Sequence, residues 1–240
     1  MSEPRPFRSD RGAGEFVVGD ELPGSGPAYV FVHGLGSVRA GEKSTSLLAH
    51  AGTLGRAFLR YDQRGHGESS GRIGLTRVSD LIGDLVHLLG RTGPAIVVGS
   101  SLGGLVGAYA AVARPDLVRA LALLAPALGL LRHLDRRLDP QGRLWTREGS
   151  GFRVEPEVLR EAMTLPEDTL PQRLHVPTLV AHGTDDDVIP WRASERFFAA
   201  IAHPRKRFWL VPGGDHRLNT FAPAIWQHVD ELVAESSGAG

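Results

Sequence analysis

The chain contains no cysteine among its 240 residues. This absence excludes disulfide bonds, thiolate metal sites and a cysteine nucleophile. It does not identify a cell compartment, because secreted proteins can also lack cysteine.

The sequence also lacks net charge, because 27 Lys and Arg residues balance 27 Asp and Glu residues. This balance argues against nucleic acid or an acidic membrane surface as a partner. The longest uncharged apolar stretch, from Ala120 to Leu131, is interrupted by Pro126 and Gly129. It falls well short of the roughly 20 residues that a membrane-spanning helix needs. No apolar run of a signal peptide follows Met1, so we predict a cytoplasmic protein without a membrane span.

Apolar, β-branched runs alternate with helical patterns along the chain, which is typical of an α/β protein. Strands are predicted at residues 16–19, 28–32, 56–61, 95–98, 121–124, 178–181 and 207–211. Helices are predicted at 42–54, 79–89, 102–113, 193–201 and 218–234. The alternation predicts a mostly parallel central sheet with helices on both faces, built as one domain over residues 1–240.

Residues 127–175 interrupt this alternation and are rich in Arg, Asp, Pro and Leu. They lie between two predicted strands. We therefore expect a small helical insertion that forms a cap over the edge of the sheet.

Ser101 lies in a G-x-S-x-G pattern between a predicted strand and a predicted helix. Gly99 and Gly103 flank Ser101 at the two spaced positions, whereas Ser100 has Val98 and Leu102 there. A turn this tight leaves no room for flanking side chains and projects the hydroxyl at the helix N-terminus. Ser101 is thus the candidate nucleophile, although a glycine-rich turn that binds phosphate would produce a similar pattern.

A serine hydroxyl is a weak nucleophile and needs a base. Among ten histidines, His216 lies in a glycine-rich loop after the last predicted strand, where an imidazole can reach over the sheet edge. Asp186 follows another strand within a group of three carboxylates, Asp185 to Asp187. The chain order Ser101, Asp186, His216 is the nucleophile–acid–base order of α/β-hydrolases.

The third requirement of such a site is a pair of N–H groups that stabilise an oxyanion. The sequence points to the backbone N–H groups of Leu102 and Leu35, with Gly36 as the less favoured choice. His33 precedes this loop, and we expect it to support the loop rather than to act as a second base.

With these residues assembled, the chain resembles the α/β-hydrolase superfamily over nearly its whole length. The motifs that carry the resemblance are His33-Gly-Leu-Gly36, Asp62-Gln-Arg-Gly-His-Gly-Glu-Ser69, the turn at Ser101 and the block His182 to Pro190. The family pattern places its catalytic acid at Asp186 and its histidine at His216. It also implies a structural role for the Asp62 loop.

Segments such as Gly41-Glu-Lys43 and Ile189-Pro-Trp191 resemble a narrower, small-cap branch with depalmitoylating thioesterases and acyl-glucuronide esterases. The resemblance implies a serine hydrolase that cleaves small acyl esters or thioesters through an acyl-enzyme, with no cofactor and no metal. Candidate walls of the substrate pocket are Leu131, Leu134, Trp145, Phe152, Met163 and Trp191. The same cap residues could instead only pack the cap onto the sheet.

Other functions remain open at this point. An amidase, a peptidase or a carbon–carbon bond hydrolase could use the same scaffold, and a ligand-binding receptor could retain the fold without catalysis. A nucleotide-binding protein is disfavoured, because no G-x-x-x-x-G-K-[ST] pattern occurs. The sequence leaves the oligomeric state open.

Overall fold

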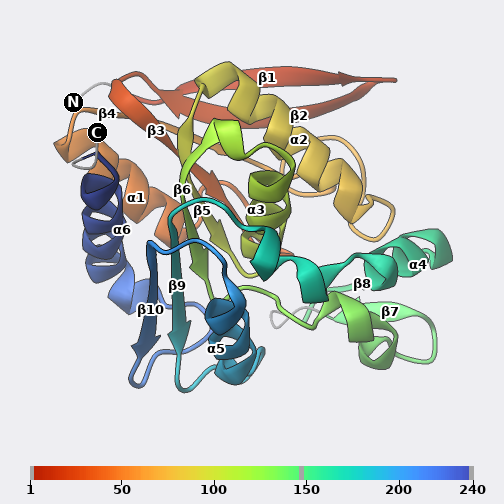
Figure 1. The fold of residues 1–240 in the computed structure, drawn as a ribbon. Helices are drawn as coiled ribbons and strands as arrows, with labels where there is room; N and C mark the ends of the chain where they lie inside the picture. Colours follow the sequence, from red (N-terminus) through yellow and green to blue (C-terminus); the bar gives the residue numbers. More distant parts are fainter. Residues whose placement is uncertain (1–2, 146–148, 238–240) are drawn as a thin grey trace.

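An eight-stranded sheet forms the centre of the molecule in the computed structural model, which describes residues 3–145 and 149–237 (Figure 1). The strand order is β1-β2-β4-β3-β5-β6-β9-β10. From β4 to β10 every neighbouring pair is parallel, whereas β2 pairs antiparallel with both β1 and β4. The predicted α/β-hydrolase architecture, with a mostly parallel sheet, is confirmed.

The bounds of the elements agree closely with the sequence pattern from β3 onward. The strands of the sheet are β1 (Arg5–Gly12), β2 (Glu15–Leu22), β3 (Ser25–Val32), β4 (Arg56–Tyr61), β5 (Ala95–Ser100), β6 (Val118–Leu124), β9 (Thr178–Gly183) and β10 (Lys206–Val211). The helices are α1 (Glu42–Thr53), α2 (Val78–Thr92), α3 (Leu102–Ala113), α4 (Pro156–Thr164), α5 (Trp191–Ala200) and α6 (Ala222–Ser237). No helix of the described residues is long and apolar enough to cross a membrane.

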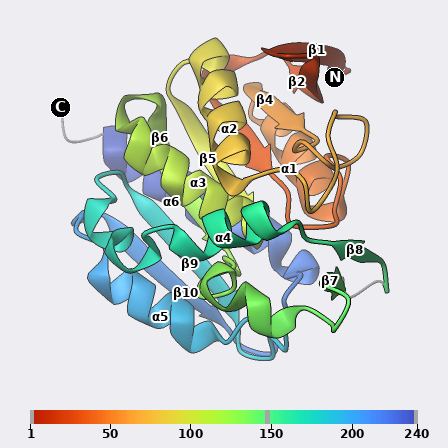
Figure 2. The ribbon, with the colours of Figure 1, turned by 90° about the vertical axis from the view of Figure 1, so that its right-hand side faces the viewer.

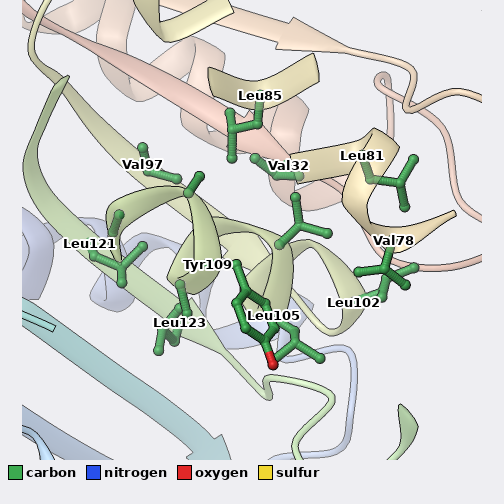
Figure 3. Close-up of a cluster of buried hydrophobic side chains, with 14 of the residues drawn as sticks. Val32, Val78, Leu81, Leu85, Val97, Leu102, Leu105, Tyr109, Leu121 and Leu123 are labelled. Atoms are coloured by element: carbon green, nitrogen blue, oxygen red, sulfur yellow. The ribbon is translucent and has the colours of Figure 1, made fainter. Parts of the chain in front are cut away.

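Helices cover both faces of the sheet, and each face has its own core. On one face, α2, α3 and α5 bury side chains against the strands. Figure 3 shows Leu105 and Tyr109 of α3 packed among Val97, Leu121 and Leu123 of the sheet. On the other face, α1 and α6 pack together, and Trp226 of α6 is almost completely buried. The apolar surface removed from water on both faces holds the strand ends in fixed positions.

The sequence pattern missed β1, which pairs with β2 as an antiparallel hairpin. The exposed residues of β1 alternate with few apolar ones, so the strand lacks the hydrophobic period that marks a half-buried strand. All three residues of its turn, Gly12, Ala13 and Gly14, have a positive φ. Two of them are glycine, which adopts a positive φ without steric cost. The hairpin forms the edge of the sheet, where backbone pairing and the burial of Val17 of β2 hold it in place.

The insertion between β6 and β9 lies together at one end of the sheet (Figures 1 and 2). It contains the expected helical pieces, α4 and the 3₁₀ helices Leu131–Arg137, Glu167–Thr169 and Pro171–Arg173. It also contains a small antiparallel hairpin of β7 (Arg143–Trp145) and β8 (Gly151–Arg153), which the sequence pattern did not predict. Such three-residue strands are too short to show a period.

The carboxylate of Glu161 fastens this insertion to the core. Glu161, on α4, accepts hydrogen bonds from the N–H groups of Val78 and Ser79 at 3.1 and 2.9 Å. These groups belong to the first turn of α2, whose N–H groups have no acceptor within the helix and which favours negative charge. The insertion is therefore held by the N-terminus of a core helix as well as by apolar contacts.

Gly99 and Gly103 let the backbone pass through the β5–α3 turn. A Cβ atom on Gly103 would lie 2.2 Å from the carbonyl oxygen of Val32, and one on Gly99 would lie 2.3 Å from the carbonyl oxygen of Gly103. Both clashes are with backbone atoms, so no side chain can move aside to relieve them. The strand β3, the strand β5 and the helix α3 meet here without space for a methyl group.

We predict that Gly103→Ala lowers the free energy of unfolding by at least about 2 kcal/mol, because the added methyl group overlaps backbone. The matched control is Gly90→Ala in α2, where a Cβ atom meets nothing within 4 Å. That change should be neutral or stabilise by up to about 1 kcal/mol, because alanine is the better helix former. Urea denaturation measures both variants, and a Gly103→Ala protein as stable as Gly90→Ala would contradict the crowding.

Candidate active site

Ser101 stands between the end of β5 and the start of α3 in a strained backbone conformation. Its φ is 54° and its ψ is −118°, a combination that residues with side chains rarely adopt. The conformation is fixed by the crowded glycines and by the Ser101 N–H, which donates to the Leu124 carbonyl at 2.9 Å. As a result the hydroxyl points away from the sheet at the carboxyl ends of the strands, where open α/β sheets bind ligands.

His216 lies within hydrogen-bond distance of this hydroxyl. Its Nε2 is 3.0 Å from Oγ of Ser101, and its Nδ1 is 2.7 Å from Oδ2 of Asp186. The three residues come from the ends of β5, β9 and β10, which are far apart in sequence. The structure thus brings together the three side chains that the sequence pattern singles out, in the relative order of a nucleophile, a base and an orienting acid.

The side chain of Asp186 is fully buried and accepts hydrogen bonds on both oxygens. Oδ1 accepts from the N–H groups of Val188 and Ile189, each at 2.8 Å. Burial on its own raises the pKa of Asp186, but hydrogen bonds from His182, His216 and the backbone of Ile189 outweigh burial and hold the pKa well below its usual range. Asp186 is therefore ionised at neutral pH and favours a proton on the adjacent nitrogen of His216.

His182 is a neighbour of Asp186 that the sequence analysis did not assign to the site. Its Nε2 lies 2.9 Å from Oδ2 of Asp186 and 3.0 Å from the carbonyl oxygen of Ile189. Since both are acceptors, Nε2 carries the proton, and the hydroxyl of Ser194 donates to Nδ1 at 2.7 Å. A buried histidine thus holds the same carboxylate oxygen that orients His216. Only its place in the His182–Pro190 block hinted at this role.

Two backbone N–H groups are available next to Ser101. Leu102 is the first residue of α3, so its N–H has no acceptor within the helix. The loop at Gly34 passes against Ser101, because a Cβ atom on Gly34 would lie 3.7 Å from its Oγ. The N–H of Gly36 instead donates to Nε2 of His66 at 3.1 Å. That contact favours Leu35 over Gly36 as the second donor.

His33 supports the loop and is held neutral. Burial, together with the charge of His66, lowers its pKa to about 4. Its Nε2 accepts from the N–H of Gln63 at 3.0 Å, and its Nδ1 donates to the carbonyl of Gly34 at 2.8 Å. Both ring nitrogens are therefore occupied, and the ring fixes the loop between β3 and α1 to the loop after β4.

The Asp62 loop is likewise a structural support. The buried carboxylate of Asp62 accepts from the backbone N–H of Arg39 at 2.7 Å, from the Arg39 guanidinium and from the N–H of Glu68 at 3.0 Å. These bonds tie the segment before α1 to the loop after β4.

Two pockets meet at Leu35, and they differ in character. One is apolar and has a volume of about 60 Å³ between the core and the insertion; Leu35, Leu102, Leu131, Leu134 and Phe152 are among its walls. The other is larger, has both polar and apolar walls, and contains Ser101 and His216. Of the remaining predicted wall residues, Trp145 lines the larger pocket, whereas Met163 and Trp191 line neither.

Metal ligands are not gathered at this site. Among residues 3–145 and 149–237, no group of three or more His, Asp or Glu side chains is placed to hold a metal ion.

A protein-family model matches most of the chain. The family is described as Hydrolase_4, serine aminopeptidase, S33, and the match covers residues 27–148 and 151–220. Among curated proteins, the mouse protein named palmitoyl-protein thioesterase ABHD10, mitochondrial, is 32% identical over 234 residues, which cover 90% of this chain and 78% of that protein. Its human counterpart is 28% identical over 234 residues, covering 90% of this chain and 76% of that protein.

Solved structures agree with this placement. The structure of α/β-hydrolase domain-containing protein 10 from mouse has a TM-score of 0.85 at 28% sequence identity, and the match covers 96% of this chain and 99% of that one. Est1E from Butyrivibrio proteoclasticus with bound ferulic acid has a TM-score of 0.81 at 20% identity, covering 95% and 99% of the two chains. The second likeness concerns the fold alone.

We predict that Asp186→Asn lowers kcat/KM on the order of 10³- to 10⁴-fold, because an amide cannot hold the proton on the nitrogen of His216 that faces it. The adjacent Asp185→Asn is the matched control. Its carboxylate accepts from the hydroxyl of Thr184 at 2.8 Å, away from His216. Ester hydrolysis assays on both variants decide between the carboxylates; equal losses would show that Asp186 is the wrong choice.

Proposed function

Because the chain belongs to the Hydrolase_4 (serine aminopeptidase, S33) family of α/β-hydrolases, we propose that it cleaves esters and thioesters of apolar carboxylic acids, with Ser101, His216 and Asp186 as its catalytic residues. The observation that carries this proposal is the pair of contacts at His216, 3.0 Å to Oγ of Ser101 and 2.7 Å to Oδ2 of Asp186, beside an apolar pocket. A neutral imidazole so placed can deprotonate the serine hydroxyl.

In the first half of the reaction, Oγ of Ser101 attacks the acyl carbonyl carbon while its proton passes to Nε2 of His216. The negative charge that develops on the carbonyl oxygen is stabilised by the N–H groups of Leu102 and Leu35. Each such donor contributes about 3 kcal/mol in comparable sites. His216 then returns the proton to the leaving alcohol or thiol, and an acyl-Ser101 ester remains. Water, deprotonated by His216, hydrolyses this ester by the same route and regenerates the hydroxyl.

The two pockets support separate binding places for the acyl chain and for the leaving alcohol or thiol. Leu35 and Leu102, whose N–H groups are the proposed oxyanion donors, also line the apolar pocket, so an acyl chain can enter it while its carbonyl oxygen stays on those donors. The alcohol or thiol would leave through the larger pocket, where Ser101 and His216 lie. Thioesters are included because the mouse relative is named as a palmitoyl-protein thioesterase.

We propose that residues 127–175 are a cap on one domain of residues 1–240, because the insertion supplies Leu131, Leu134 and Phe152 to the acyl pocket while the core supplies the catalytic residues. The cytoplasmic location stays a prediction, and the mouse and human relatives are named as mitochondrial proteins. The family description names an aminopeptidase, so an amide substrate should be tested in the same assays.

We predict that Ser101→Ala abolishes hydrolysis of p-nitrophenyl butyrate and labelling by a fluorophosphonate, because the attacking oxygen is gone. Thermal unfolding should remain cooperative, since the change removes one atom at the pocket surface. A wild-type chain that neither turns over esters nor takes the label would instead support a receptor that retains only the fold. Undiminished turnover in Ser101→Ala would assign the nucleophile elsewhere.

We predict that Ala162→Phe shifts the preference toward short acyl chains, because Ala162 is 2% exposed and lines the apolar pocket. The neighbouring Met163→Phe is the control, since Met163 is 37% exposed and lines neither pocket. We would compare kcat/KM for p-nitrophenyl acetate, butyrate, octanoate and palmitate. The acetate-to-octanoate ratio should rise about tenfold in Ala162→Phe alone; an equal shift in both variants would place the acyl chain elsewhere.

A further inference from the structure

Lys43 connects the first turn of α1 to the loop that carries His216. Its Nζ donates to the backbone carbonyl of Arg217 and, at 3.3 Å, to Oδ1 of Asn219. The amide nitrogen of Asn219 in turn donates to the carboxylate of Glu42 at 2.6 Å. The two acceptors of Lys43 lie one and three residues after His216, so one ammonium group bridges the segment that immediately follows the proposed base.

The backbone of this segment must be fixed by its surroundings, because Leu218, between the two acceptors of Lys43, has a left-handed conformation. Its φ is 54° and its ψ is 20°, which is unfavourable for a residue with a branched side chain. A conformation of this kind persists only where its surroundings impose it. The buried Leu218 side chain and the bond from its N–H to Oδ1 of Asp215 at 2.9 Å impose it from one side. On the other side, the hydrogen bonds from Lys43 to Arg217 and Asn219 impose this conformation.

The position of Lys43 is costly for a cation. It is the second residue of α1, where the helix dipole disfavours positive charge. Burial lowers the pKa of Lys43 to about 8. Among the described residues, no carboxylate oxygen lies within ion-pair distance of its Nζ, and both of its acceptors are neutral. A charge kept where it lowers stability is typical of a functional position.

We propose that Lys43 is a positioning residue whose ammonium group holds the 215–219 loop so that His216 stays within reach of Ser101. The inference rests on the proposed catalytic role of His216. It assigns Lys43 no contact with the reacting atoms: it acts through the loop. Without the hydrogen bonds of Lys43, here called the Lys43 clamp, His216 can move from its place 3.0 Å from Oγ of Ser101. Small displacements of a catalytic group cost large factors in rate.

The clamp predicts opposite effects of alkaline pH on activity and on stability. The charged groups that face Lys43 are Asp215 and Arg217 on the loop and Glu42 on α1. Since the pKa of Lys43 is about 8 in the folded chain and about 10.4 in an unfolded one, the folded state binds fewer protons between these values. Its contribution to stability therefore rises as pH increases through this range. Activity should fall over the same range, because the neutral amine holds the loop less strongly.

The test compares Lys43→Met with Lys206→Met, the only other lysine in the chain. Met keeps the length of the side chain and removes its charge and its donors. Lys206 also donates to backbone carbonyls, those of Phe198, Ala199 and Ile201, but at the start of β10, away from the catalytic residues. With p-nitrophenyl butyrate, Lys43→Met should lose about tenfold or more in kcat with KM changed less than about twofold. Lys206→Met should keep its kcat.

A rescue and a pH profile separate positioning from mere structure. Lys43→Arg keeps a charge that does not titrate here, so it should retain most of the kcat and lose the decline that the wild type shows above about pH 8. With ¹³C-lysine labelling, the two Cε resonances, assigned through Lys206→Met, report the pKa of Lys43 directly. If Lys43→Met is insoluble, Asn219→Ala removes one acceptor and should lower kcat in the same direction.

The possible results decide the matter. An unchanged kcat in Lys43→Met overturns the proposal, as does a loss confined to KM. A third result would also overturn it: a loss of turnover in Lys43→Met with the butyryl ester of para-hydroxybenzoate, whose leaving group is anionic, but not with that of para-hydroxybenzamide, whose leaving group carries no carboxylate. Lys43 would then be a binding group for an anionic leaving group. Failure of the proposed function is distinguishable, since a wild type without Ser101-dependent turnover would be inactive before any change at Lys43.

Discussion

The candidate site depends on the close approach of three backbone segments at Ser101. The end of β3 passes against Gly103, the end of β5 passes against the first turn of α3, and the loop at Gly34 contacts the serine itself. The contacts are between backbone atoms, which cannot move aside as side chains do. This crowding holds Ser101 in its unfavourable conformation and also brings the proposed oxyanion donors to it. The two large cores on either side of the sheet provide the stability that this strain consumes.

A second set of polar residues fixes the loops that carry the proposed catalytic residues. His33 and Asp62 hold the loop of the proposed oxyanion donor Leu35, His182 holds Asp186, and Lys43 spans the segment after His216. Most of these groups are buried, where an unpaired polar atom is costly, so their hydrogen bonds strongly restrict the loops. The distances at His216 therefore result from contacts on every side and not from its own loop alone.

The proposed catalytic residues and the proposed acyl pocket come from different parts of the chain. The residues that would make and break the acyl bond follow strands of the core, whereas the insertion between β6 and β9 supplies much of the apolar pocket. Glu161 fastens that insertion to the N-terminus of α2, and Arg137 donates to the carbonyl of Val188 at 3.0 Å, close to Asp186. The insertion is thus connected to the Asp186 loop while it lines the proposed acyl pocket. Relatives can share the core chemistry and differ in substrate through this segment alone.

The sequence by itself determined the strands of the sheet from β2 onward, the helices other than α4 and the serine–acid–histidine order, because these leave local signals: a hydrophobic period, a glycine spacing and a chain order. Tertiary structure decided the rest. The β1 strand has too few apolar residues to show a period, and β7 and β8 are too short to show one. Met163 and Trp191 lie outside both pockets although their residue types suit a wall. The roles of His182 and Lys43 depend on contacts with Asp186 and Asn219. Lys43 and Asn219 are 176 residues apart, and a sequence carries no spacing signal over such a separation. Only the packing of α1 beside the ends of the strands brings them together.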